Sequence, residues 1–101
     1  MEADDPQDDF EVHVEDETVT ATGEIDVATA PQLTAAIASI TDGPVVLDLS
    51  GVGFMDSSGI GALLTAHDLL AAAGRQLRVG PRSPVVDRVL NVSGADDLLA
   101  S

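Results

Sequence analysis

The sequence has no cysteine, no lysine, no tryptophan and no tyrosine. Without cysteine, the chain forms no disulfide and offers no thiolate to a metal ion. Without lysine, it lacks the residue that a Walker phosphate-binding loop requires. The active site of a phospho-accepting receiver domain also uses a lysine, so that class is excluded too. Four arginines carry all the formal positive charge: Arg75, Arg78, Arg82 and Arg88.

Long hydrophobic runs are also absent. No apolar segment approaches the length of a transmembrane helix. The first five residues, Met-Glu-Ala-Asp-Asp, lack the basic and apolar regions of a signal peptide. We therefore expect a soluble cytoplasmic protein.

The charge is strongly negative and unevenly distributed. The formal net charge is −14, and nine of the eighteen acidic residues fall within residues 1–17. Such acidity opposes contact with the phosphates of nucleic acids and with anionic membranes. We therefore expect no nucleic-acid partner and no membrane partner.

The chain divides into an acidic tail and one domain. Residues 1–9 (MEADDPQDD) hold almost no apolar side chains, which predicts a disordered tail that keeps the protein soluble. An arm that binds a partner is the alternative for this segment. Residues 10–101 suit one domain with one core, since they contain no repeat and no linker.

Hydrophobic periodicity predicts the elements of this domain. Alternating residues indicate strands over 10–14 and 19–23, paired as a hairpin, and His13 lies on their polar face. A helical stripe follows from Leu33 to Ile40, and an almost continuous apolar run over 45–49 indicates a buried strand. The order of strands and helices predicts an α/β domain with a mixed sheet that opens with a hairpin.

The second half repeats the alternation. A helix after residue 57 shows one stripe of Ile60, Leu63, Leu64, Leu70 and Ala71 and a second of Ala62, Ala66, Leu69 and Ala73, and ends at Gly74. Residues 77–79 form a short strand that Gly80-Pro81 ends. A helix over 84–90 follows, and residues 96–99 are the last ordered segment.

Helix caps can be predicted at two places. Thr29 with Gln32 three residues later resembles a capping box, in which the threonine side chain caps the helix. Ser83 before Pro84 favours a second capped helix start.

The segment from Val45 to Gly61 carries the clearest chemical suggestion. It predicts a buried strand, a short glycine-bearing loop and then Ser57 and Ser58 at the mouth of a helix. A hydroxyl there is exposed, and the helix dipole favours negative charge beside it. Ordinary helix capping by serine is the alternative role for this pair.

Catalytic motifs were tested against the same segment. A G-x-S-x-G nucleophile elbow would need glycine at Met55 to use Ser57, and at Asp56 and Ile60 to use Ser58. Gly51-x-Gly53 begins a dinucleotide pattern, but Asp56 occupies the third glycine site and would repel a diphosphate. His67 has no partner at metal-ligand spacing. We therefore expect no enzyme activity, no cofactor and no metal, and any phosphate on Ser57 should come from another protein.

Several segments together resemble a known family. Residues 23–33 (GEIDVATAPQL) and 54–61 (FMDSSGIG) are similar to the two signatures of STAS domains of the anti-sigma-factor antagonist type. Residues 82–90 (RSPVVDRVL) and 92–94 (VSG) resemble the later family pattern, so the likeness covers roughly residues 10–99. It implies a single STAS-like α/β domain, with helices packed on a mixed sheet.

The chain departs from this family at its C-terminal end, which looks truncated. Family members usually continue past the region of Leu98 with a last strand and a helix. A neighbour or a dimer partner could cover the sheet edge, or the last segment could be helical. The oligomeric state stays open.

The resemblance also implies a function. The family binds an anti-sigma factor, often a serine kinase, and so releases a sigma factor. The kinase phosphorylates the serine after the loop aspartate, here Ser57, and a partner phosphatase reverses this. The resemblance places partner binding on the loop and its surroundings, at Asp26, Asp56, Ser58, Gly59, Ile60 and Gly61.

Other interpretations stay open for the same residues. Ser58 is the alternative phosphorylation site, and otherwise a helix cap or a hydroxyl that steadies the loop. Asp26 and Asp56 could be two separately solvated loop acids. The domain could also be a STAS interaction module that is not phosphorylated, within a regulatory or transport assembly. A hydrolase that uses Ser57 is the remaining alternative.

Overall fold

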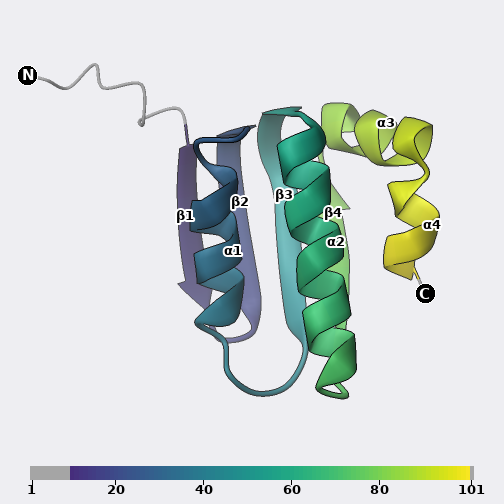
Figure 1. The fold of residues 1–101 in the computed structure, drawn as a ribbon. Coiled ribbons are helices and arrows are strands. Elements are labelled where there is room, and N and C mark those ends of the chain that lie inside the picture. The colour runs from purple at the N-terminus through teal and green to yellow at the C-terminus, as the bar shows by residue number, and fades with distance from the viewer. Residues whose placement is uncertain (1–9, 101) are drawn as a thin grey trace, which may run out of the picture.

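The computed structural model describes residues 10–100, in the order β1-β2-α1-β3-α2-β4-α3-α4 (Figure 1). The strands are β1 (Phe10–Glu15), β2 (Thr18–Ile25), β3 (Val45–Met55) and β4 (Leu77–Arg82). The helices are α1 (Ala30–Ala38), α2 (Ser57–Ala72), α3 (Pro84–Ser93) and α4 (Ala95–Ala100). The tail predicted for residues 1–9 lies outside the described residues, as does Ser101.

The described strands form one mixed sheet in the order β1-β2-β3-β4. β1 pairs with β2 in the antiparallel direction, while β2, β3 and β4 run parallel to one another. The predicted hairpin is confirmed, with Phe10 opposite Gly23 and Glu15 opposite Thr18. Asp16 adopts a left-handed φ of 55° in its tight turn, a conformation that aspartate tolerates better than most residues.

β3 is longer than predicted, so the assignment of residues 50–55 to a loop was wrong. The strand continues to Met55 because its second half also pairs with β2, with Gly51 opposite Thr22 and Met55 opposite Ile25. A Cβ atom on Gly51 would lie only 2.6 Å from the Thr22 side chain. The glycine therefore serves close strand pairing rather than a loop.

α1 and α2 lie side by side on one face of the sheet (Figure 1). α1 buries Leu33, Ala36 and Ile37, as its stripe predicted, and they belong to the same core cluster as Leu47 and Leu49 of β3. Burial of such side chains contributes about 1.5–3 kcal/mol each. This face of the sheet therefore holds the core.

The buried line of α2 differs from the predicted stripes. Gly59, Leu63, Ala66 and Leu70 are buried, whereas Leu69 is 65% exposed. Successive helical residues lie about 100° apart, so Leu69 points well away from the face that Leu70 buries. α2 ends at Ala72, and Gly74 adopts the left-handed φ of 74° that suits the predicted stop.

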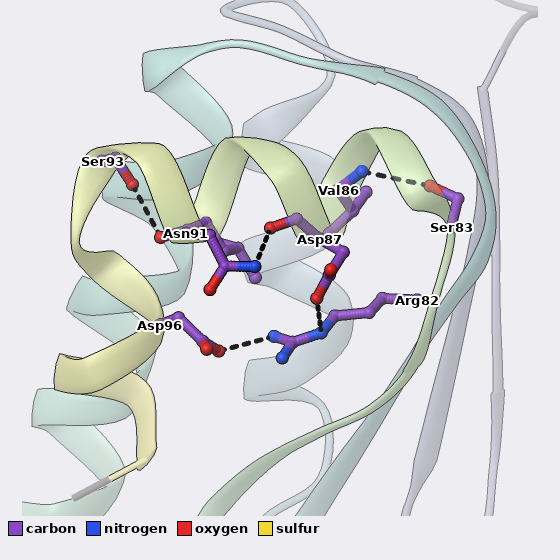
Figure 2. Close-up of polar contacts among 8 residues, drawn as sticks. Arg82, Ser83, Val86, Asp87, Asn91, Ser93 and Asp96 are labelled. Carbon is purple, nitrogen blue, oxygen red and sulfur yellow. Dashed lines mark hydrogen bonds and ion pairs between the residues drawn. The ribbon is translucent and has the colours of Figure 1, made fainter.

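β4 also extends beyond its prediction, through Gly80 and Pro81 to Arg82, which is paired with Leu49. β4 tolerates Pro81 because, within residues 10–100, it is an edge strand that pairs only with β3. On its unpaired side, β4 needs no backbone N–H donor. Ser83 then caps α3, as predicted, by accepting the Val86 N–H at 3.2 Å (Figure 2). Its hydroxyl also donates to the Val52 carbonyl on β3 at 2.5 Å.

An ion-pair cluster holds the last helices to β4. The Arg82 guanidinium lies 3.1 Å from the Asp87 carboxylate on α3 and 2.8 Å from Asp96 on α4 (Figure 2). α3 ends at Ser93, and its C-cap Gly94 has a left-handed φ of 79°. Residues 96–99 lie in α4, so the helical alternative for this segment is the correct one. Among residues 10–100, no helix is long and apolar enough to cross a membrane.

Candidate functional site

The fold brings two distant sequence segments together at the carboxyl ends of β2 and β3. Ile25 pairs with Met55, so Asp26 and Asp56 follow neighbouring parallel strands at the same edge of the sheet. The Asp56 N–H donates to the Ile25 carbonyl at 3.2 Å. Ligand and partner sites of α/β proteins commonly form at this edge.

Asp26 organises the loop between β2 and α1. Its carboxylate accepts the N–H groups of Ala28 at 3.0 Å and Thr29 at 3.1 Å. The Thr29 hydroxyl accepts the Asp26 N–H at 2.9 Å and donates to the Glu24 carbonyl at 2.8 Å. Asp26 is therefore a structured loop acid rather than a freely solvated one.

Thr29 is not the side-chain cap that the sequence predicted. It precedes α1, but its side chain makes no cap hydrogen bond to that helix. Its hydroxyl points back to Asp26 and Glu24 instead, and this local hydrogen bonding competes with the capping-box geometry.

Asp56 is the N-cap of α2. It has an extended backbone, and its carboxylate accepts the Ser58 N–H at 2.9 Å. An aspartate cap satisfies a free N–H and places negative charge at the positive end of the helix dipole. The alternative role of Ser57 or Ser58 as the helix cap is therefore excluded, because the preceding acid fills that position.

The two serines then occupy the first helical positions. Ser57 is exposed, Ser58 is half-buried, and neither hydroxyl forms a hydrogen bond within residues 10–100. A nucleophilic serine would need a hydrogen-bonded base. The described residues give Ser57 none, and they contain no group of three potential metal ligands. The hydroxyl of Ser57 is thus available to an external enzyme.

The two histidines lie elsewhere. The His13 side chain on β1 is 75% exposed and lies 4.0 Å from Glu15, as expected from its predicted place on the polar face of the hairpin. The His67 side chain is 17% exposed and lies 3.4 Å from Asp68 in α2. Neither histidine reaches the Asp56–Gly61 turn through a hydrogen bond.

The glycines of the turn have different surroundings. Gly59 is buried, and a Cβ there would lie 2.5 Å from Met55 Cγ and 2.8 Å from Ile25 Cγ2. Gly61 is exposed, and a Cβ there would meet nothing within 4 Å. Gly59 therefore lets α2 sit on the strand ends, while Gly61 leaves the outer surface bare. Ile60, between them, is half-buried against the core.

Comparison with known proteins assigns the chain to a family. Residues 9–100 match the STAS domain family model. The chain belongs to the STAS domain family. Two curated relatives are anti-sigma F factor antagonists, each 40% identical: one from Lysinibacillus sphaericus over 77 residues, one from Paenibacillus polymyxa over 50. The STAS domain aligns over 65% and 43% of their respective lengths, less than two thirds of either.

Solved structures match this STAS domain as well. An anti-sigma factor antagonist from Mycobacterium paratuberculosis is 31% identical, with a TM-score of 0.72 over 88% of this chain and 80% of that one. The unphosphorylated anti-sigma factor antagonist SpoIIAA is 29% identical, with a TM-score of 0.68 over 85% and 81% of the two chains. The predicted α/β fold with a mixed sheet is therefore confirmed.

The STAS domain also exposes apolar residues at the site that the sequence analysis did not select. Val27, directly after Asp26, is 77% exposed, and Phe54, two residues before Asp56, is 46% exposed. Val27 could have been selected from the sequence, because it is an apolar residue in a polar loop. Phe54 gave no signal, because the residues around it were assigned to a loop instead of to β3.

Proposed function

We propose that this STAS domain is an anti-sigma-factor antagonist: it binds an anti-sigma factor and thereby releases a sigma factor. The observation that carries the proposal is the exposed Ser57 hydroxyl, which has no hydrogen bond within residues 10–100 and stands at the first position of α2, directly after the Asp56 cap. The relatives and solved structures named as antagonists support it. This function is a binding activity, exercised in the cytoplasm.

The proposal includes a switch at Ser57. The partner is an anti-sigma factor that is also a serine kinase, it phosphorylates Ser57, and a serine phosphatase restores the hydroxyl. A related structure is that of the Bacillus cell fate determinant SpoIIAA in its phosphorylated form, 27% identical with a TM-score of 0.64, which supports such a step. Ser58 is the less accessible of the two serines, because it is half-buried.

Phosphorylation should change binding far more than folding. It adds roughly −1.5 to −2 charges at the start of α2. The helix dipole favours that charge, whereas the Asp56 carboxylate on the Ser58 N–H opposes it, so the net change in stability is small. A partner carboxylate about 4 Å away would be repelled by about 4 kcal/mol per pair of unit charges at an effective dielectric near 20. Binding would then weaken about a thousandfold.

The first prediction follows from this switch. Ser57→Ala should bind the anti-sigma factor as the unmodified chain does and resist phosphorylation. Ser57→Asp should bind at least about tenfold more weakly, because it adds charge beside the partner. Both variants should keep the wild-type melting temperature. The measurements are pull-down from the source cell, then calorimetry and kinase labelling with the purified anti-sigma factor that is recovered.

Gln32→Glu is a matched control for charge, since Gln32 is exposed in the first turn of the neighbouring helix α1. It adds one negative charge and should leave the affinity within about twofold. Equal binding by Ser57→Asp and wild type, with labelling at Ser58 or at neither serine, would contradict the assignment. That result would favour a STAS interaction module that is not phosphorylated.

A further inference from the structure

α1 and α2 lie side by side (Figure 1). A shallow groove lined by residues of both helices follows their seam and begins beside the Asp56–Gly61 turn. It consists of two adjoining hollows of about 540 and 370 Å³, which share Thr34 and Ala38. Val27 lines the hollow beside Ser58, and Leu69 lines the other. These two side chains are 77% and 65% exposed, so apolar surface marks both ends of the groove.

The groove is uncharged in a strongly acidic protein. None of the residues that line the first hollow is charged, although the chain has a net charge of −14. Arg75 is the one charged residue of the second hollow, and its guanidinium donates to the carbonyls of Gly43 and Ile40. The groove therefore favours an apolar occupant over a basic or acidic one.

Gly61 indicates that something approaches the groove closely. It lines the first hollow and sits inside α2, where glycine costs about 0.5–1 kcal/mol relative to alanine. Nothing in the fold requires this glycine, since a Cβ would meet no atom within 4 Å. Gly59, by contrast, is required by Met55 and Ile25. Packing within residues 10–100 therefore does not explain Gly61, whose bare surface leaves room for an occupant of the groove.

The walls of the groove favour a helix as the occupant. An extended peptide usually binds by adding to an open strand edge, whereas the walls here are helices whose backbone groups bond internally. The seam from Gly61 to Leu69 covers eight helical steps of about 1.5 Å, or about 12 Å of helix. A helix with one apolar side and little more than two turns would cover it.

We propose that the α1–α2 groove receives such a helix from the anti-sigma factor, laid along α2 from Gly61 to Leu69. The inference rests on the proposed function, and it names the surface and the kind of segment that the partner contributes. Because Ser58 lines the groove, an occupant that fills it lies beside the first turn of α2, which also carries Ser57. Phosphate on Ser57 would then stand at the end of the docked helix.

The test uses the full chain and the purified anti-sigma factor recovered with it. Gly61→Leu fills the groove floor, and Leu69→Ser removes the apolar side chain at the far end. Each should weaken binding at least about tenfold in calorimetry. Ala72→Leu, at an exposed position of α2 outside the groove lining, is the matched control and should change the affinity less than about twofold.

Gly61→Ala gives a sharper test, because it should raise the stability of the fold and lower the affinity for the anti-sigma factor. A better helix former should raise the melting temperature by a few degrees, while the added methyl group lowers affinity about threefold or more. Wild-type affinity in Gly61→Leu or in Leu69→Ser would overturn the groove proposal, and the antagonist function would stand if Ser57→Asp still lost binding. If the wild-type chain bound no anti-sigma factor, both proposals would fail.

Discussion

At the scale of single residues, the geometry of the site depends on a glycine that no side chain can replace. Gly59 lies where the first turn of α2 meets the ends of β2 and β3. The side chains of Met55 and Ile25 fill the space that a Cβ on Gly59 would need. Asp56, three residues earlier, sets where that helix begins. Together, Gly59 and Asp56 set the position and the start of α2, and so the orientation of the Ser57 side chain.

Gly59→Ala should therefore destabilise the fold. The new Cβ would lie 2.5 Å from Met55 Cγ and 2.8 Å from Ile25 Cγ2, so α2 must move or the core must repack. Overpacking of this kind costs about 1–3 kcal/mol, which should lower the melting temperature by several degrees. Gly53→Ala is the control, since a Cβ there meets nothing within 4 Å. Equal melting temperatures for the two variants would show that the contact at Gly59 relaxes freely.

At the scale of elements, α3 and α4 are held by Arg82 together with a small buried face. Val86 and Leu90 of α3 and Ala95 and Leu99 of α4 enter the core. Arg82 adds two ion pairs, one to each helix (Figure 2). Its side chain is only 24% exposed, so these pairs are screened less than surface pairs are.

Arg82→Gln should loosen this end of the molecule. It leaves the carboxylates of Asp87 and Asp96 without their shared cation, at a cost of about 1 kcal/mol, because their side chains are 51% and 32% exposed and water replaces part of the interaction. Hydrogen exchange should quicken in α3 and α4 and stay unchanged in β2 and β3. Arg88→Gln on the exposed side of α3 is the control, because Arg88 has no ion pair within residues 10–100. Equal protection in both variants would mean that burial alone holds the helices.

The elements also show what the sequence could predict. The hairpin, the Ser83 cap and the buried face of α1 follow from short-range patterns, so they were predicted correctly. Thr29 was misjudged because its hydroxyl had two local partners, Asp26 and Glu24, that a capping pattern does not reveal. The second half of β3 was missed because its pairing with Thr22 and Ile25 is set by tertiary structure. The α1–α2 groove could not be predicted for the same reason. The sequence places Leu69 on an apolar stripe, and only the packing of α2 on the sheet shows that this leucine is exposed.

At the scale of the whole molecule, part of the negative charge lies in residues 1–9, which can be deleted in an experiment. Five of the eighteen acids lie in residues 1–9, so removing them changes the net charge from −14 to −9. We propose that residues 10–101 belong to the STAS domain and that residues 1–9 do not, since the core is built from residues 10–100.

A chain that starts at Phe10 should melt within about 2 °C of the full chain, because the loss of self-repulsion is a weak, screened effect. Differential scanning calorimetry at matched ionic strength measures this. Replacing the five acids by their amides in the full chain separates the loss of charge from the loss of residues. A drop of many degrees on truncation alone would mean that residues 1–9 contribute to the core.

The pairing of Ile25 with Met55 has a consequence for how the protein matures. Thirty positions separate these residues along the chain, and they meet only when β2 and β3 align in parallel around the whole of α1. Bringing the two strands together closes the loop between Ile25 and Met55, which has an entropy cost. Contacts between residues close in sequence do not offset that cost, so parallel pairing of this kind forms slowly. The Asp26 loop and the start of α2 therefore come together late. A chain in which β2 and β3 are not yet aligned would not present this surface, so binding at it would report that these two strands have paired.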